Sequence, residues 1–173
     1  GGPTTFSVSF YVNGALTNTV GPTAATWDIN TNTLRIGASE QFASAVFNGL
    51  IDDVKFWTSI RSANQLRDNR FVSLGDARNS NVGSAITSSS HYANLVSSWT
   101  FGNTGTANDD ISGFNGSYVG GATAINVKGG RPIPYNFALQ CNFGTNDYVQ
   151  APDNAVYNQS GAGTMDAWVY PTG

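Results

Sequence analysis

The sequence predicts an all-β fold, an antiparallel sandwich of two sheets with little helix. Several segments alternate apolar and polar residues with the period of two that turns one face of a strand toward a core. Glycine is abundant, at 20 residues, and only 11% of the 173 residues are charged. That charged share is about half the usual one and, with many Ser, Thr and Asn residues, favours short strands joined by tight turns over amphipathic helices.

The first part of the chain contains strand signals and one helix signal. Alternation predicts strands at residues 4–13, 15–20, 33–37 and 47–58. The dipeptide Asn13-Gly14 between the first two strands is the one that a type I′ hairpin turn prefers. Ser62 is a good N-cap, so a short helix is expected over residues 63–69.

The later part of the chain is predicted to be extended throughout. Residues 73–92 are rich in Ser, Asn and Gly without a clear period, which predicts a linker. Beyond it, strands are predicted at residues 95–101, 139–143, 148–151 and 164–170. The organisation expected is therefore a segment 1–72, the linker 73–92 and a segment 93–173.

Charge and cysteine content exclude several classes of function. The net charge is −3 and the eight basic residues are scattered, so we expect no nucleic-acid partner. No apolar run is long enough to span a bilayer, so we expect no membrane insertion. Cys141 is the only cysteine, which excludes an internal disulfide, and its neighbours predict a small core residue more than a reactive thiol.

Short motifs in both segments carry a family resemblance. The later segment contains an aromatic strand at 99–101, Asp-Ile-Ser-Gly at 110–113 and Ala-Trp-Val-Tyr-Pro at 167–171. The earlier one contains Tyr-Val-Asn-Gly at 11–14 and Ile-Asp-Asp-Val at 51–54. The later motifs resemble the opening of laminin-G-like (concanavalin A-like lectin/glucanase) jelly-roll domains, and the earlier motifs resemble the later strands of such domains. The resemblance implies a jelly-roll sandwich whose halves occur in reversed order.

Three arrangements explain that order. The chain can be a window from a repetitive protein, joining the end of one jelly roll (1–72) to the start of the next (93–173). It can be a permuted sandwich in which these two segments pack against each other. Or each incomplete half can be completed by neighbouring chains, because unfinished sheets expose strand edges that recruit other strands.

The resemblance also implies a calcium site. In the laminin-G-like family a calcium ion often joins the early loop to the final strand, which implies Asn103, Asp110 and Asp52 as ligands here. Calcium takes six to eight oxygen ligands, and loops supply these readily. The structural alternative is that Asp52 or Asp53 accepts backbone N–H bonds from a nearby loop and that Asp109 caps a turn.

Carboxylates in a jelly roll also raise the question of a glycosidase, since related folds include glucanases. Such an enzyme needs two carboxyl groups that face one cleft. Strict alternation places the adjacent Asp52 and Asp53 on opposite faces of their strand, so we expect no enzyme.

Aromatic residues are candidates for stacking against sugars. Trp99 and Trp168 occupy alternating strand positions and are expected in the core. Trp27 and Tyr157 lie in loop-like segments and are the expected exposed, ligand-binding aromatics.

The sequence thus predicts a non-enzymatic module of an extracellular or cell-surface protein, working in adhesion or as a structural repeat. Its expected partners are identical chains or adjoining repeats of the same protein, together with glycans. Two alternatives stay open: a subunit of an extracellular filament assembled by strand completion, and a carbohydrate-binding module attached to an enzyme.

Overall fold

The computed structural model of the chain describes residues 4–25, 32–39, 45–69, 93–102, 104–127, 137–157 and 161–172. These residues form ten strands, one α-helix and two 3₁₀ turns, and every ladder between the named strands is antiparallel. The prediction of an all-β antiparallel sandwich is confirmed. The linker predicted at 73–92 lies outside the described residues.

The elements follow one another in this order: β1 (Thr4–Val12), β2 (Ala15–Ala25), β3 (Leu34–Ile36), β4 (Gly49–Trp57), α1 (Ala63–Asn69), β5 (Leu95–Trp99), β6 (Ser117–Val119), β7 (Thr123–Asn126), β8 (Phe137–Cys141), η1 (Phe143–Thr145), β9 (Tyr148–Ala151), η2 (Ala155–Tyr157) and β10 (Thr164–Pro171). The strand β7 had no clear signal in the sequence.

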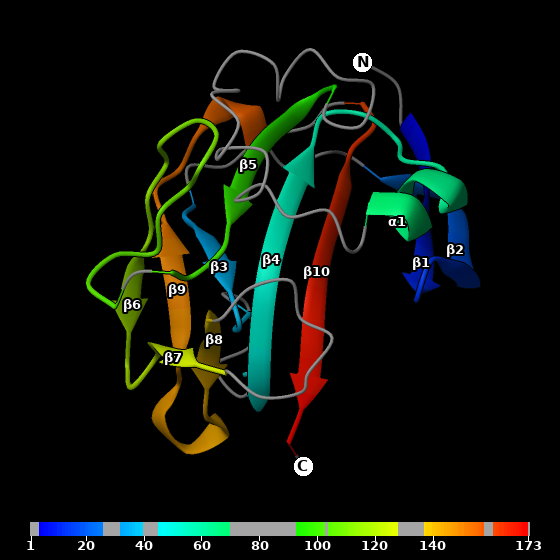
Figure 1. Cartoon of the computed structure of the whole chain (residues 1–173). Coiled ribbons are helices and arrows are strands. Elements are labelled where there is room, and N and C mark those ends of the chain that lie inside the picture. The colour runs from blue at the N-terminus through cyan, green and yellow to red at the C-terminus, as the bar shows by residue number, and fades with distance from the viewer. Residues whose placement is uncertain are drawn as a thin grey trace.

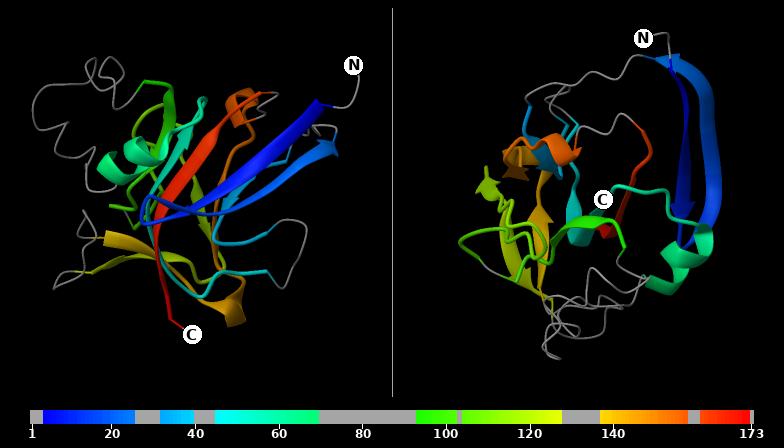
Figure 2. Two further views of the ribbon diagram at one scale, coloured as in Figure 1. Left: turned by 90° about the vertical axis from the view of Figure 1, so that its right-hand side faces the viewer. Right: turned by 90° about the horizontal axis from the view of Figure 1, so that it is seen from above.

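The strands form two facing sheets and a separate hairpin. The larger sheet has the order β10-β4-β8-β7, with β5 also paired to β4, and the second sheet has the order β3-β9-β6. β1 and β2 pair only with each other among the described strands. Figure 1 shows β4 and β10 side by side at the centre, with β3 and β9 on one side and the hairpin beyond β10 on the other. The view from above gives the same order (Figure 2).

The central strand β4 joins the two segments distinguished in the sequence. It pairs with β10, β5 and β8, all of which come from the segment 93–173. The short strand β3 likewise pairs with β9. The two segments therefore share their sheets, which is the arrangement that a permuted sandwich requires.

The hydrophobic core lies between the two facing sheets. Its members include Trp99, Phe101, Leu139 and Val149, all nearly inaccessible to solvent. Cys141 lies in the same core, where burial, with a smaller effect of Asp147, raises the pKa of its thiol to about 12. The prediction that this cysteine is a small core residue is confirmed.

The predictions of a hairpin turn at Asn13-Gly14 and of a helix N-cap at Ser62 are confirmed. Asn13 and Gly14 have φ values of 52° and 76°, the positive values that a type I′ turn needs at both central positions. At α1, the Gln65 N–H donates to the Ser62 hydroxyl at 3.3 Å and the Ser62 N–H donates to the Gln65 side chain at 2.9 Å. This reciprocal pair is a capping box and explains where the helix begins.

Candidate functional site

A β-bulge interrupts the centre of β4. Its pairing with β10 steps from Asp52–Trp168 to Lys55–Asp166, so β4 contains one more residue than its partner between these two pairs. Asp53, inside this step, has a φ of 51°, in the left-handed region where a non-glycine residue is uncommon. An extra residue with left-handed backbone is characteristic of a bulge.

The bulge changes which side chains face the core. Ile51 and Val54 both belong to the core although they are three residues apart, which strict alternation does not allow. The residues between them, Asp52 and Asp53, therefore both point away from this core. The prediction that the two carboxylates lie on opposite faces of the strand is wrong, because the bulge shifts the alternation by one residue.

The two carboxylates belong to a buried group of charges, the β4 charge cluster, made of Asp52, Asp53, Lys55 and Asp166. The first three residues are only 1%, 0% and 1% exposed. Lys55 forms an ion pair with Asp53, and its Nζ lies 3.7 Å from a carboxylate oxygen of Asp166. The other oxygen of Asp166 accepts a hydrogen bond from the indole N–H of Trp57 at 2.6 Å. Two carboxyl groups thus contact a single ammonium group, whose charge also acts on Asp52.

Burial disfavours the ionised form of the carboxyl groups in this cluster. Burial raises the pKa of Asp52 to about 8, although the Asp53 N–H donates to its Oδ1 at 2.7 Å. Burial likewise raises the pKa of Asp53 to about 6, against the opposing effect of Lys55. The Oδ2 of Asp52 and the Oδ1 of Asp53 accept no hydrogen bond. Burial therefore favours the protonated form of both carboxyl groups, and of Asp52 more than of Asp53.

Asp109 serves a structural role in the neighbouring loop. This buried carboxylate accepts backbone N–H bonds from Ser98 at 2.9 Å, Ile111 at 3.1 Å and Phe114 at 3.2 Å. Three such bonds fix the loop against the end of β5, so the interpretation of Asp109 as a turn cap is confirmed.

Asp110, next in sequence, lies beside β5 and acts on the charge cluster. Its carboxylate accepts a hydrogen bond from the Thr100 hydroxyl at 3.0 Å, and its negative charge is one of those that raise the pKa of Asp53. The charges that act on Asp52 are those of Asp53 and Lys55. Asn103, the third ligand expected for calcium, lies outside the described residues. Within the residues that are described, no three His, Cys, Asp or Glu side chains come together as a metal site.

Comparison with known proteins identifies the earlier part of the chain. Residues 3–67 match the family model of the Concanavalin A-like lectin/glucanases superfamily, of laminin-G type. Residues 3–67 are laminin-G-like. The match spans β1 to β4 and most of α1, so it includes the bulge and three members of the β4 charge cluster. No curated protein and no solved structure matches the chain.

This partial match supports an adhesion-type or carbohydrate-binding module in general terms. Among the helices in the described ranges, none is long and apolar enough to cross a membrane.

Tyr157 is not the exposed loop residue that the sequence predicted. It lies in η2, half-buried against the core, and its ring contacts those of Phe56, Trp99 and Phe114 at centroid distances of 5.3, 6.2 and 5.9 Å. Its hydroxyl shares a hydrogen bond with the hydroxyl of Ser97 at 2.8 Å. These contacts hold the side chain against the sandwich and leave it little freedom to stack on a ligand.

Only one of the two tryptophans expected in the core lies there. Trp99 is fully buried in the core, as predicted. Trp168 is half-buried and lies outside the core cluster, so its assignment to the core is wrong. It stands on β10, opposite Asp52 and therefore on the side of β4 away from the core. Trp27, the other expected ligand-binding aromatic, lies outside the described residues.

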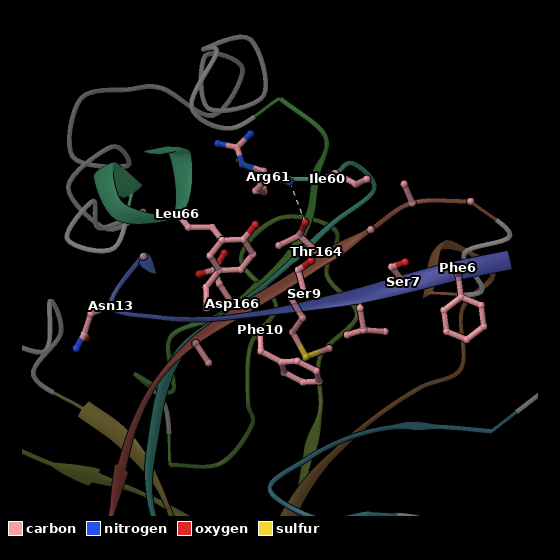
Figure 3. A pocket seen from close by; sticks show the side chains of 18 of the residues that line it. Phe6, Ser7, Ser9, Phe10, Asn13, Ile60, Arg61, Leu66, Thr164 and Asp166 are labelled. Atoms are coloured by element: carbon pink, nitrogen blue, oxygen red, sulfur yellow. Dashed lines mark hydrogen bonds between the residues drawn. The ribbon is translucent and has the colours of Figure 1, made fainter. Parts of the chain in front are cut away.

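The structure also contains a groove that sequence reasoning missed. We call it the β1–β10 groove; it has a volume of about 790 Å³. It is lined mainly by residues 5–11 of β1, residues 161–168 at and before β10, and Ile60, Arg61 and Leu66. Figure 3 shows Phe10, Ser9 and Asp166 around this space. Its walls are more than a hundred residues apart, so no local signal could have revealed it.

Proposed function

We propose that the chain is a non-enzymatic module of an extracellular surface protein, working in adhesion or as a repeated structural unit. The family match supports an adhesion-type module. The burial of Asp52 and Asp53 supports the absence of catalysis. The observation that carries the proposal is the burial of the β4 charge cluster.

A glycosidase needs two carboxyl groups on either side of the scissile bond, about 5 to 10 Å apart and open to substrate. Asp52 and Asp53 are inaccessible, and Lys55 neutralises Asp53. Asp166 lines the β1–β10 groove but is held by the indole N–H of Trp57. Among the described residues this region thus offers one accessible carboxyl group where hydrolysis needs two.

The test combines a hydrolysis assay with an adhesion assay. We expect no release of reducing ends from a panel of β-glucans, galactans and chitin oligosaccharides. We expect beads coated with the chain to aggregate or to bind surfaces coated with extracellular glycans. Turnover that is lost in Asp166→Asn would make the chain an enzyme, and beads that neither aggregate nor bind would remove the adhesive role.

The proposal includes a calcium ion between the loop 102–110 and β4, held by Asn103, Asp110 and Asp52. Two observations support a cation at this place. The Oδ2 of Asp52 is buried without a hydrogen-bond donor, and Asp110 adds negative charge at the neighbouring Asp53. A cation would add to the positive charge that Lys55 provides. Because its oxygen ligands would come from both the loop and the strand, it would also link these two segments.

A further inference from the structure

Lys55 is a buried amine whose chemistry the proposed function does not use. Its side chain is only 2% exposed, which is rare for a lysine. The Nζ forms an ion pair with Asp53 and lies 3.7 Å from the Oδ1 of Asp166. Burying an ion pair costs desolvation energy that its Coulomb attraction offsets only in good geometry. Stability alone is therefore a weak explanation for an amine held between two carboxyl groups.

The ladder between β4 and β10 places Lys55 directly opposite Asp166. Residues opposite each other in an antiparallel ladder point to the same face, with Cβ atoms about 5 Å apart. Figure 1 shows these two strands side by side along their length. Groups held in such a fixed geometry react with effective molarities of about 10⁵–10⁸ M. An amine and a carboxyl group that do not condense in dilute solution can therefore do so here.

The carboxyl group of Asp166 is oriented for attack by this amine. Its Oδ1 lies 3.7 Å from the Nζ of Lys55, while its Oδ2 accepts a hydrogen bond from the indole N–H of Trp57 at 2.6 Å. When an amine adds to the carboxyl carbon, negative charge develops on the oxygen that stays, and a donor already in place stabilises that charge. Asp166 is partly exposed and lines the β1–β10 groove (Figure 3), so a water molecule released from Oδ1 has a way out.

Asp53 is the group that can carry protons between the two. It contacts the same Nζ, and its side chain is fully buried. Asp53 is a poorer target for the amine than Asp166, because no donor contacts its Oδ1 to stabilise developing negative charge. An amide to Asp53 would also join two residues that are neighbours in one strand. Asp53 therefore serves as the base, since it is in direct contact with the amine.

We propose that Lys55 and Asp166 condense to form an intramolecular amide bond between β4 and β10. The ammonium group of Lys55 passes one proton to the Asp53 carboxylate, and the free amine attacks the Cγ of Asp166. Asp53 then delivers this proton, and afterwards a second one from Nζ, to Oδ1. The C–N bond forms, the Cγ–Oδ1 bond breaks and water leaves. An ammonium and a carboxylate thus become a neutral amide and one water molecule, without any oxidant or reductant, and Asp53 ends as it began.

The amide fastens the last strand to the laminin-G-like segment. It links two residues that are more than a hundred positions apart, so it closes a long loop and restricts the unfolded chain, as a disulfide does. This chain has one cysteine and can form no internal disulfide. A covalent bond between neighbouring strands also keeps them together under a pulling force, which suits a surface protein. The bond depends on neither glycan binding nor calcium, so its test is separate from theirs.

Mass spectrometry of the whole folded chain tests the proposal directly. We expect an intact mass lower than that of the sequence by one water molecule. Trypsin does not cut after an acylated lysine, so a digest should contain a branched peptide that is uncut after Lys55 and joins residues of β4 to residues of β10. Fragmentation of this peptide should place the branch at Asp166.

Matched variants, each measured on protein whose circular dichroism shows the native sheet, assign the roles. Lys55→Arg keeps the positive charge but not the amine, and Asp166→Ala removes the carboxyl group, so both should retain the full sequence mass. Asp153→Ala, at an exposed position, should lose water as the parent does. Asp53→Asn introduces a residue type that tolerates the left-handed backbone at this position and should slow condensation at least about tenfold.

A folded parent chain with the full sequence mass would overturn the proposal, independently of any variant. Loss of water without a branched peptide, which indicates a succinimide, would overturn it too. The same holds for a branch that ends at Asp53 and persists in Asp166→Ala. Condensation of Asp53→Asn at the parent rate would overturn the proton-carrying role of Asp53.

Discussion

Trp57 and Asp166 are 109 positions apart in the sequence, yet the indole N–H of the tryptophan donates to the aspartate carboxylate at 2.6 Å. The bond crosses the β4–β10 ladder and so joins the laminin-G-like segment to the last strand. Arg61 covers the indole ring from 4.1 Å, and Trp57 is fully buried. This contact therefore links the two segments, with the indole ring buried and the Asp166 carboxylate partly exposed.

The hydrogen bond should contribute measurably to stability. We expect Trp57→Phe and Asp166→Asn each to lower the free energy of unfolding, and their double-mutant cycle to give a coupling energy of about 1–3 kcal/mol. Urea denaturation of the parent, both single variants and the double variant measures it. A coupling energy indistinguishable from zero would mean that the two segments are not held by this contact.

The β4 charge cluster predicts a pH dependence with a definite sign. Burial raises the pKa values of Asp52 and Asp53 from 3.8 to about 8 and about 6. The folded chain therefore binds these protons more tightly than the unfolded chain does. Their contribution to stability is complete below about pH 4 and is lost as the pH rises through about 6 and 8. We expect the melting temperature to be lower at about pH 8.5 than at about pH 5.

A single variant tests whether Asp52 causes this loss. Asp52→Asn cannot ionise, and one pKa unit corresponds to about 1.4 kcal/mol, so the variant should be at least about 1 kcal/mol more stable than the parent at about pH 8.5. Near pH 5 the two should differ much less. If the parent and Asp52→Asn lose stability in parallel as the pH rises, another group is responsible.

Local patterns predicted much of this fold, for identifiable physical reasons. The positive φ values required at Asn13 and Gly14, and the capping box at Ser62, depend on a few neighbouring residues, so sequence alone was sufficient. The bulge at Asp53 was invisible, because no periodicity predicts an aspartate in left-handed backbone. It reversed the conclusion about which face each carboxylate occupies.

The burial of the candidate aromatic residues depended on long-range contacts, which the local sequence does not reveal. Tyr157 has a loop-like sequence around it, but its ring packs against Trp99 of the core and against Phe56 of β4. Trp168 has a strand-like sequence around it, but its side of β10 is turned away from the core. Alternation predicts that a strand has two distinct faces, but it does not predict which face packs against the core.

Asp147 should be among the most sensitive polar residues of the chain. This buried carboxylate accepts hydrogen bonds from the Gly121 N–H at 2.5 Å and from the backbone and side-chain amides of Asn142 at 2.9 and 3.0 Å. Burial alone would raise its pKa, but hydrogen bonds from Thr145, Gly121 and Asn142 hold it below the usual value. Its contribution is therefore present at neutral pH and lost on acidification below about pH 4.

We expect Asp147→Ala to destabilise the chain by about 2–4 kcal/mol at neutral pH, since three donors lose their acceptor. Asp153→Ala, at an exposed position, is the control and should change stability by less than about 0.5 kcal/mol. Chemical denaturation followed by tryptophan fluorescence measures both. Equal effects of the two substitutions would show that the hydrogen bonds to Asp147 are not needed.

Calcium is expected to raise the melting temperature if it binds between the loop 102–110 and β4. A ligand that binds only the folded state stabilises it by RT ln(1 + [L]/Kd), which is about 2.7 kcal/mol when its concentration is one hundred times Kd. Calcium should therefore raise the melting temperature by several degrees over a chelator, and Asp110→Asn should remove most of that rise. Asp153→Asn removes the same charge at an exposed position and should retain the rise in melting temperature.

Calcium should also lower the apparent pKa of Asp52, because a bound cation favours the ionised carboxylate. The loss of stability at alkaline pH would then shrink when calcium is present. Melting curves that coincide with and without calcium, at about pH 7.5 and about pH 8.5 alike, would exclude the ion from this module.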